Sequence, residues 1–347
     1  MKKIIAVSVT LFLFFILLGI NVNAQQEEKN NAKSTDIKVH KKQLISDEER
    51  KSLDELAKGK MGSGARSRVF QPLATGIVGE PIPTTGERYA IVVGLANYNG
   101  TANDLCPLVA ETDEADVSVF PTTDPRYYCQ DYDSIHMKDA LVNQYGYNPA
   151  NITILRDSDA TKASIVDAMN SLQSKLDGDD EVVFFYSGHG VSGNYYGIVD
   201  GEKVDEAIYT YDGQFIWDDD LKAWADSLSV YREAFVFDMC LAGGMNDIAG
   251  VNRVIAMSSV ENQSSWTYTL GGGGTSTSGY TYSEGLFSHY FVVSGMTNMQ
   301  ADSINLLSQV DSQVTAEEAF SYTYPIIKTK QAPVLSDKFT NDLLLGH

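Results

Sequence analysis

Uninterrupted apolar runs alternate with helically patterned segments from residue 89 onward. Residues 89–95 read Tyr-Ala-Ile-Val-Val-Gly-Leu, which is typical of a strand buried on both faces of a sheet. Further strands are expected at 152–155, 182–186, 234–237 and 254–257, and helices at 134–145, 161–176 and 218–228. Residues 315–347 add one helix and a Pro-marked extended stretch. This alternation predicts an α/β fold with a mostly parallel sheet and helices on both faces.

The first 24 residues have a different pattern. Lys2 and Lys3 precede an apolar run over residues 4–20, and a small-residue Val-Asn-Ala stretch ends at Ala24. This order predicts a signal peptide at 1–24 that is cleaved after Ala24, and hence a secreted or periplasmic protein with no membrane partner after cleavage. An uncleaved membrane anchor is the alternative, because the run approaches the length that spans a bilayer.

Residues 25–85 are polar, lack strand patterns and are expected to be a pro-segment or a linker. A short amphipathic helix is predicted at 45–58, with Asp47 as a possible N-cap. The basic, glycine-containing stretch 62–68 predicts a flexible segment, and so does the Gly/Ser/Thr-rich stretch 271–279. The folded domain is accordingly placed at 86–347.

The net charge of the chain limits the kinds of molecule that it is expected to bind. The chain has 26 Lys and Arg residues against 46 Asp and Glu residues, a formal net charge of -20. Such a chain repels phosphate, so no nucleic-acid partner is expected. It suits cationic partners instead, such as metal ions or peptides rich in Lys and Arg.

Three cysteines leave at least one thiol unpaired. Cys106 and Cys129 flank an irregular, proline-containing stretch, so a Cys106–Cys129 disulfide is the simplest pairing outside the cytosol. Cys240 is then free. The alternative is that none of the three is paired.

Two predicted strands end in reactive residues. The strand at 182–186 leads to His189, between two glycines, and the strand at 234–237 leads to Cys240. Carboxyl ends of parallel strands meet at one edge of a sheet, so we expect the imidazole and the thiol to lie together. A thiolate supported by an imidazole is a nucleophile, and the backbone N–H groups of Gly190 and Cys240 are candidates for an oxyanion hole. The alternatives are an inert core cysteine and a loop histidine.

From residue 89 to the C-terminus the chain resembles the caspase–haemoglobinase clan, which includes caspases, metacaspases, legumains and clostripain-like peptidases. The marks are Tyr-Ser-Gly-His-Gly at 186–190 and Asp-Met-Cys at 238–240, and residues 151–157 also look like metacaspases. The resemblance implies a caspase-like three-layer sandwich over 86–347 and a cysteine endopeptidase. Leu241 departs from the His or Glu that usually follows the clan cysteine, which leaves the subfamily open.

Metacaspase resemblance also implies a pocket for a basic side chain, lined by Asp238, Ser187 and Asp133, with Asp131 as an alternative to Asp133. A carboxylate at 238 can pair with substrate Arg or Lys, although capping of the turn is another role for it. No cofactor is expected for the chemistry. The resemblance implies a calcium site as well, with these candidate ligands: Asp205, Asp218, Asp219 and Asp247. Acidic residues at a helix start have an ordinary structural explanation too.

We therefore expect a secreted zymogen that hydrolyses peptide bonds after Arg or Lys. Basic residues in the leader are candidates for self-processing, namely Lys58, Lys60, Arg66 and Arg68. A legumain-like peptidase that cuts after Asn, or a transpeptidase, is one alternative. An inactive caspase fold that serves as an extracellular binding protein is another.

Overall fold

The computed structural model describes residues 37–62, 73–106, 129–193, 204–270 and 282–347. The predicted leader at 1–24, most of the basic stretch 62–68 and the glycine-rich stretch 271–279 lie outside these ranges. Chain contacts divide the protein into two units, Met1–Lys38 with Gly193–Asp205, and Val39–Ser192 with Glu206–His347. The second unit contains the fold and the site described below.

A six-stranded sheet forms the centre of this unit. Its strand order is β14 (Val334–Asp337), β11 (Arg253–Met257), β10 (Arg232–Asp238), β6 (Glu181–Ser187), β3 (Arg88–Gly94) and β5 (Ile152–Arg156). All neighbours are parallel except the edge pair β11–β14, which is antiparallel. These strands confirm the predicted parallel sheet.

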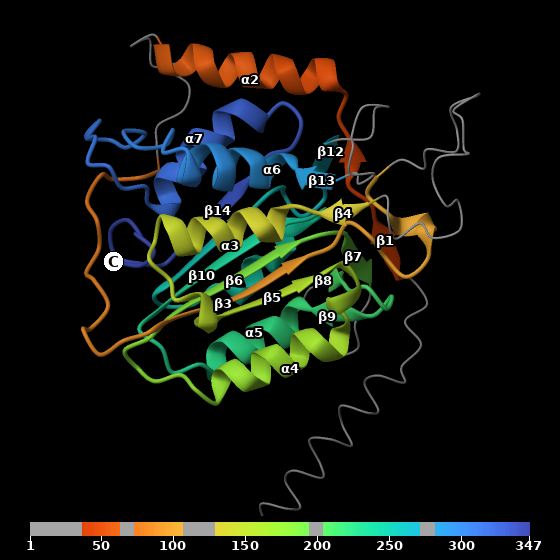
Figure 1. Ribbon diagram of the computed structural model, residues 1–347, viewed down its shortest axis with the longest axis horizontal. Coiled ribbons are helices and arrows are strands. Elements are labelled where there is room, and N and C mark those ends of the chain that lie inside the picture. Colours follow the sequence, from red (N-terminus) through yellow and green to blue (C-terminus); the bar gives the residue numbers. More distant parts are fainter. Residues whose placement is uncertain (1–36, 63–72, 107–128, 194–203, 271–281) are drawn as a thin grey trace, which may run out of the picture. The chain divides into compact units, whose positions relative to one another are not determined.

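Helices cover both faces of the sheet (Figure 1). On one face lie α3 (Asp133–Asn143), α6 (Leu286–Ser288), the π-helix His289–Thr297 and α7 (Ala316–Ile327), and on the other lie α4 (Lys162–Gln173) and α5 (Asp218–Ser227). Side chains of β3 alternate between the two apolar cores, with Ala90 and Val92 in one and Ile91 and Val93 in the other. This period of two confirms the three-layer sandwich.

Smaller strands surround the carboxyl edge of the large sheet. One set has the order β1 (Lys38–His40), β7 (Gly190–Gly193), β8 (Asp205–Tyr209) and β9 (Phe215–Trp217). The other has the order β2 (Gln43–Leu44), β12 (Trp266–Leu270), β13 (Tyr282–Gly285) and β4 (Gln130–Asp131). Short 3-10 turns occur at Thr101–Asn103, Pro149–Asn151, Asp157–Asp159 and Ala242–Ile248.

The stretch before the domain is more structured than its sequence predicts. Strands β1 and β2 lie in the stretch 25–85, where no strands were expected. They form because strands from other parts of the chain supply their hydrogen bonds. Helix α2 (Asp47–Gly62) confirms the expected helix, but its cap is Ser46 and not Asp47. The Ser46 hydroxyl accepts the Glu49 N–H at 3.2 Å, and the Glu49 carboxylate accepts the Ser46 N–H at 3.3 Å. This reciprocal pair is a capping box.

A buried arginine fixes the amino-terminal ends of the central strands. Arg232 begins β10, and its Nε donates to Glu181 of β6 at 2.6 Å. Its terminal nitrogens donate to three backbone carbonyls, those of Glu80 at 3.0 Å, Leu344 at 3.0 Å and His347 at 2.9 Å.

Within the described ranges, every helix is too short or too polar to cross a bilayer.

We predict that Arg232→Ala lowers the free energy of unfolding by roughly 3–5 kcal/mol, because it leaves the buried Glu181 carboxylate without its cation. Urea denaturation followed by circular dichroism measures the change. The exposed Lys175→Ala serves as the control and should change stability by less than about 0.5 kcal/mol. Equal stability of the two variants would contradict this role for Arg232.

Candidate active site

Strand register brings the predicted cysteine and histidine together. Strands β6 and β10 pair in parallel with Ser187 opposite Asp238, so His189 and Cys240 each follow two residues beyond the same rung. Gly190 lies directly against the backbone of Cys240, because a Cβ placed on Gly190 would be 1.9 Å from the Cys240 carbonyl oxygen. Only glycine allows this approach. The structure thus places the expected dyad and the expected oxyanion donors at one edge of the sheet.

The ring of His189 is fixed on every side. Tyr98 stacks on it with ring centroids 4.8 Å apart, and the Tyr98 hydroxyl accepts the His189 backbone N–H at 2.8 Å. Nε2 lies 2.7 Å from the backbone carbonyl of Asn103. A carbonyl only accepts, so the proton of the neutral imidazole sits on Nε2. Nδ1 is therefore free to accept, and it accepts the backbone N–H of Lys42 at 3.3 Å.

Cys240 is buried at the start of a strained turn. Its Sγ accepts the backbone N–H of Ser265 at 3.2 Å. The next residue, Leu241, has φ 63° and ψ 22°, in the left-handed region that a branched side chain rarely adopts. Its own N–H is donated to the carbonyl of Gln263 at 2.9 Å, which helps to hold this conformation. Strain of this kind is frequently found beside reactive residues.

Both members of the dyad are neutral in this conformation. Burial raises the pKa of the Cys240 thiol, and the Ser265 N–H and the Lys42 ammonium oppose that rise only in part. Burial also lowers the pKa of His189 to about 3, although the Asn103 carbonyl favours the protonated ring. The positive charge of Lys42 lowers the His189 pKa further. A protonated thiol and a neutral imidazole are the resting form of this site.

An acidic pocket lies beside the dyad, and Asp238 is its centre. The carboxylate accepts the Ser265 hydroxyl at 2.9 Å, and it accepts both the N–H and the hydroxyl of Ser288, at 2.9 and 2.8 Å. Its fourth partner is a cation, the Nζ of Lys42, 2.9 Å away. Both side chains of this ion pair are completely buried. Asp238 therefore binds an ammonium group in addition to holding the local turns.

Ser187 and Asp133 complete the pocket. The Nζ of Lys42 donates to the Ser187 hydroxyl at 2.9 Å, and that hydroxyl donates to Asp133 at 2.5 Å. Asp133 also accepts the backbone N–H of Gly285 at 3.0 Å. Burial raises the pKa of Asp133 well above its ordinary value, while the Lys42 charge lowers it. The structure thus places Asp133 in the pocket.

Asp131, the alternative to Asp133, has a different role. It accepts the backbone N–H of Ser134 at 3.1 Å and lies 3.8 Å from the Nε of Arg156. These contacts hold the start of α3, away from the Lys42 ammonium. The spacing of the sequence alone did not separate the two aspartates.

The absence of a side chain at Gly285 leaves room in the pocket for the Lys42 ammonium group. A Cβ on Gly285 would lie 2.0 Å from Asp238 Oδ2 and 2.8 Å from Lys42 Nζ. The ammonium group therefore occupies space that only glycine leaves open at this position.

Sequence reasoning missed several residues of the site, namely Lys42, Tyr98, Asn103, Ser265, Gly285 and Ser288. Gly285 ends β13, Ser288 ends α6 and Asn103 ends a 3-10 turn. Lys42, Tyr98 and Ser265 lie in connecting segments, and tertiary contacts bring all six to the site. Helical or strand periodicity carries no signal for such residues.

The calcium site expected at Asp205, Asp218, Asp219 and Asp247 stays a prediction. Asp218 begins α5, and its carboxylate accepts the backbone N–H groups of Asp219 at 2.8 Å and of Glu206 at 3.2 Å. Asp247 lies in the 3-10 turn that follows Cys240, and Asp205 begins β8. Over the described ranges, no three His, Cys, Asp or Glu side chains are grouped as metal ligands. We assign no step to calcium, and dependence on it stays a prediction.

The disulfide and the free thiol are found as expected. Cys106 and Cys129 are bonded, with their Cα atoms 5.5 Å apart, and Cys240 is a free cysteine.

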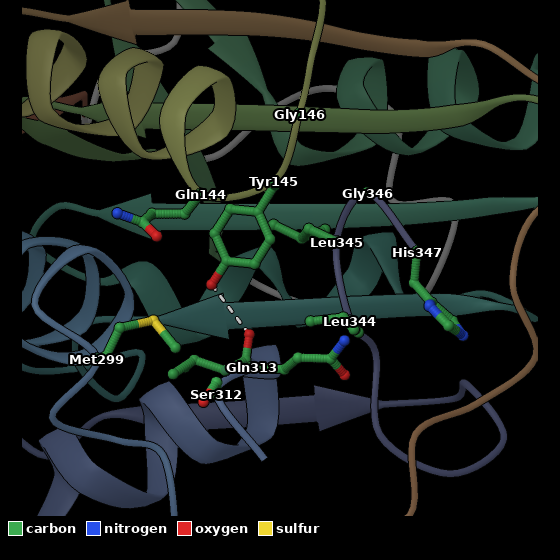
Figure 2. Close-up of a pocket in the computed structure, with 11 residues that line it drawn as sticks. Gln144, Tyr145, Gly146, Met299, Ser312, Gln313, Leu344, Leu345, Gly346 and His347 are labelled. Atoms are coloured by element: carbon green, nitrogen blue, oxygen red, sulfur yellow. Dashed lines mark hydrogen bonds between the residues drawn. The ribbon is translucent and has the colours of Figure 1, made fainter.

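A cavity of about 310 Å³ lies away from the cysteine and the histidine, and it is lined by residues that include Tyr145, Met299 and Leu344. Figure 2 shows Tyr145 pointing into it, and its hydroxyl donates to the Val314 carbonyl at 2.9 Å. None of the dyad or pocket residues lines this cavity.

The chain is similar in sequence to curated metacaspases. The chain resembles Metacaspase-1 of Schizosaccharomyces pombe, with 28% identity over 177 residues, which is 47% of this chain and 36% of that protein. Metacaspase-1 of Kluyveromyces lactis is 29% identical over 47% of this chain and 35% of its own length. Metacaspase-4 of Arabidopsis thaliana is 34% identical over 33% of this chain and 29% of its own. The chain thus spans about a third of the length of these curated relatives.

A solved structure of a Geobacter sulfurreducens protein is similar over 72% of this chain and 92% of that chain, with a TM-score of 0.46 and 16% identity. That level of similarity supports no functional conclusion.

A mostly parallel sheet between two helical layers, with a cysteine and a histidine at its carboxyl edge, defines the caspase-like α/β sandwich. The caspase domain model matches residues 115–344, and the chain belongs to this family.

We predict that iodoacetamide modifies Cys240 of the intact protein at least about tenfold more slowly than a free cysteine near pH 8, because only the thiolate reacts and burial disfavours it. The rate should keep rising through the ordinary thiol pKa of about 8.5, since the pKa of Cys240 is raised. Mass spectrometry of the modified chain measures it, and unfolding in urea should restore the ordinary rate. A rate that is flat from about pH 5 to 8 would indicate a preformed thiolate–imidazolium pair and contradict the neutral dyad.

Proposed function

We propose that this protein is a secreted cysteine endopeptidase that hydrolyses peptide bonds after Arg or Lys. The observation that carries the proposal is the buried carboxylate of Asp238, which already holds a lysine ammonium at 2.9 Å beside the cysteine and the histidine. Membership of the caspase domain family supports the peptidase chemistry, and the predicted signal peptide supports secretion.

In this proposal a substrate Lys or Arg enters the pocket and pairs with Asp238. The thiol proton of Cys240 moves to Nδ1 of His189, and Sγ attacks the scissile carbonyl carbon. Backbone N–H groups at Cys240 and Gly190 stabilise the oxyanion. The imidazolium then protonates the leaving amine and the C–N bond breaks. Water hydrolyses the thioester, giving its proton to His189, and the thiol is regenerated.

The chemistry of the pocket favours a charged substrate residue over Asn. A neutral amide at this position would leave the charge of a buried carboxylate uncompensated, which is unfavourable. A guanidinium or an ammonium supplies that charge together with hydrogen bonds.

We predict that Cys240→Ala lowers kcat/KM for Arg- and Lys-ending reporter peptides by at least about 10⁴-fold, because the nucleophile is lost. Asp238→Asn should lower it by roughly 10- to 100-fold, the value of a hydrogen bond to a charged group. A reporter panel that varies only the P1 residue measures both effects, and circular dichroism checks folding.

The exposed Asp167→Asn on α4 is the matched control and should leave the rate unchanged. Full activity of folded Cys240→Ala would rule out the proposed nucleophile. Preference of the wild-type protein for Asn at P1 would replace the proposed specificity by a legumain-like one.

Self-processing of the leader is part of the proposal. Lys58 and Lys60 lie in α2, and Arg66 and Arg68 follow in residues outside the described ranges. We predict that the wild-type protein gains a new N-terminus after one of these basic residues and that Cys240→Ala does not. Mass spectrometry of both proteins tests this, and identical N-termini would show that the protein does not process itself.

A further inference from the structure

The chain before the domain passes directly over the dyad. The Nε2 of His40 lies 2.8 Å from the Ser192 hydroxyl, just beyond His189. Lys42 follows in the acidic pocket, and β2 then pairs with β12. Ile45 is buried in the core that covers this face of the sheet. Within the second unit, the stretch from His40 to Ile45 therefore covers the catalytic edge from one side to the other.

This stretch fills the place of a substrate. The Lys42 ammonium has the charge, the donors and the burial that a basic substrate residue would have in the same pocket. Because the two charges of the Lys42–Asp238 pair are completely buried, no second cation can bind while Lys42 remains. The occupant is tethered, so its effective concentration at the pocket is in the millimolar range or above.

The backbone of the occupant runs in the wrong direction for hydrolysis. Cleavage after Lys42 needs the nitrogen of Gln43 at Nδ1 of His189, where the leaving amine is protonated. The Gln43 N–H is instead donated to the Ser265 carbonyl at 2.9 Å. The nitrogen at Nδ1 belongs to Lys42 itself, 3.3 Å away. His189 therefore faces the bond that precedes the bound lysine and not the bond that follows it.

Sheet pairing holds this direction. Strand β2 runs parallel to β12, with Gln43 opposite Trp266 and Leu44 opposite Thr267. The Ile45 N–H is donated to the Thr267 carbonyl at 2.9 Å. A reversal of the Lys42 backbone would break these bonds.

Helix α2 anchors the C-terminal side of the same stretch. Leu53 and Ala57 are buried in the core, and the Tyr290 hydroxyl donates to Asp54 at 2.8 Å. The Arg50 guanidinium lies 5.1 Å from the centre of the Tyr268 ring. The occupant is thus held by a lysine in the pocket, a strand on β12 and a helix on the sheet's helical layer.

We propose that residues 40–62 are a built-in inhibitor in which Lys42 occupies the pocket for basic residues, with its backbone reversed so that the enzyme does not cut it. This inference rests on the proposed function, since it concerns the regulation of the same site. In this proposal the lysine that inhibits the enzyme, Lys42, is not one of the basic residues at which the leader is cut. Cleavage in the C-terminal part of α2 or beyond it, in the region of Lys58 to Arg68, would remove the tether and let the occupant dissociate.

The state of the dyad fits this role. Lys42 places a positive charge beside His189 and closes the site to water, and both effects keep the imidazole unprotonated. When the segment leaves, the Lys42 charge and the exclusion of water are both lost, so a thiolate–imidazolium pair forms more readily.

The first experiment compares initial rates on an Arg-ending reporter for full-length wild type, Lys42→Ala and Lys42→Arg, with the N-termini checked by mass spectrometry. We expect Lys42→Ala to be at least about tenfold faster than wild type, because a competing internal ligand lowers the fraction of open enzyme. Lys42→Arg should stay inhibited, since the pocket accepts either cation. The neighbouring Lys41→Ala is the matched control and should behave as wild type.

The second experiment tests the direction of the backbone. A synthetic peptide covering residues 37–62 is added to Lys42→Ala and should inhibit it competitively with the reporter, and the same peptide carrying Lys42→Ala should not. The wild-type peptide should be recovered uncut at the bonds on either side of Lys42. If the full-length Lys42→Ala variant folds poorly, the same peptides can be added to enzyme from which the N-terminal segment has been removed. The inference therefore stays testable.

The outcomes separate the two claims. Equal, Cys240-dependent rates for wild type and Lys42→Ala would refute the built-in inhibitor and leave the proposed function standing. A Cys240-dependent cut after Lys41 or Lys42 would refute the reversed backbone. Absence of any Cys240-dependent hydrolysis by all variants and by the segment-free enzyme would remove the proposed function, and the inhibitor with it.

Discussion

The parallel register of β6 with β10 is the constraint on which the site depends. Because Ser187 and Asp238 share a rung, the residues that follow them leave the sheet at the same height. A shift of one residue would turn the side chains of one strand to the opposite face and separate the thiol from the imidazole. The apolar side chains of both strands alternate between two cores, and their packing holds this register.

Burial of charge governs what the site can hold. Asp238 accepts hydrogen bonds from Ser265 and Ser288 and lies against Gly285, and none of these residues supplies a positive charge. A buried carboxylate without a cation is unfavourable, so the pocket has a strong preference for an ammonium or a guanidinium. The protein satisfies that preference with its own Lys42. Substrate recognition and the conformation of the N-terminal segment therefore share one electrostatic requirement.

Much of this architecture could be predicted from the sequence. The apolar runs and helical periodicities located the five parallel strands and their crossover helices, since each signal is local and strong. His189 and Cys240 were recognisable because they directly follow two such strands. The pairing of Cys106 with Cys129 was expected because the two residues flank an irregular, proline-containing stretch, and the structure contains this disulfide.

The remaining features depend on contacts between distant parts of the chain. Strands β1 and β2 are too short and too polar to be seen in the sequence, and they exist because neighbouring strand edges supply their hydrogen bonds. Lys42 resembles any other lysine of a polar leader until the fold brings Asp238 to it. The same holds for Asn103, whose carbonyl fixes the histidine tautomer through its backbone and leaves no mark in residue type.

If the proposed function and the built-in inhibitor hold, Gly285 links the choice of substrate to the latency of the enzyme in evolution. The space that it leaves open is used by the internal lysine, and an incoming substrate residue would have to use the same space. Any substitution that reshapes this space for a different substrate also loosens or expels the internal ligand. A lineage that drifts toward a new cleavage preference must therefore alter position 42 in step, or give up the means of keeping the newly made enzyme silent.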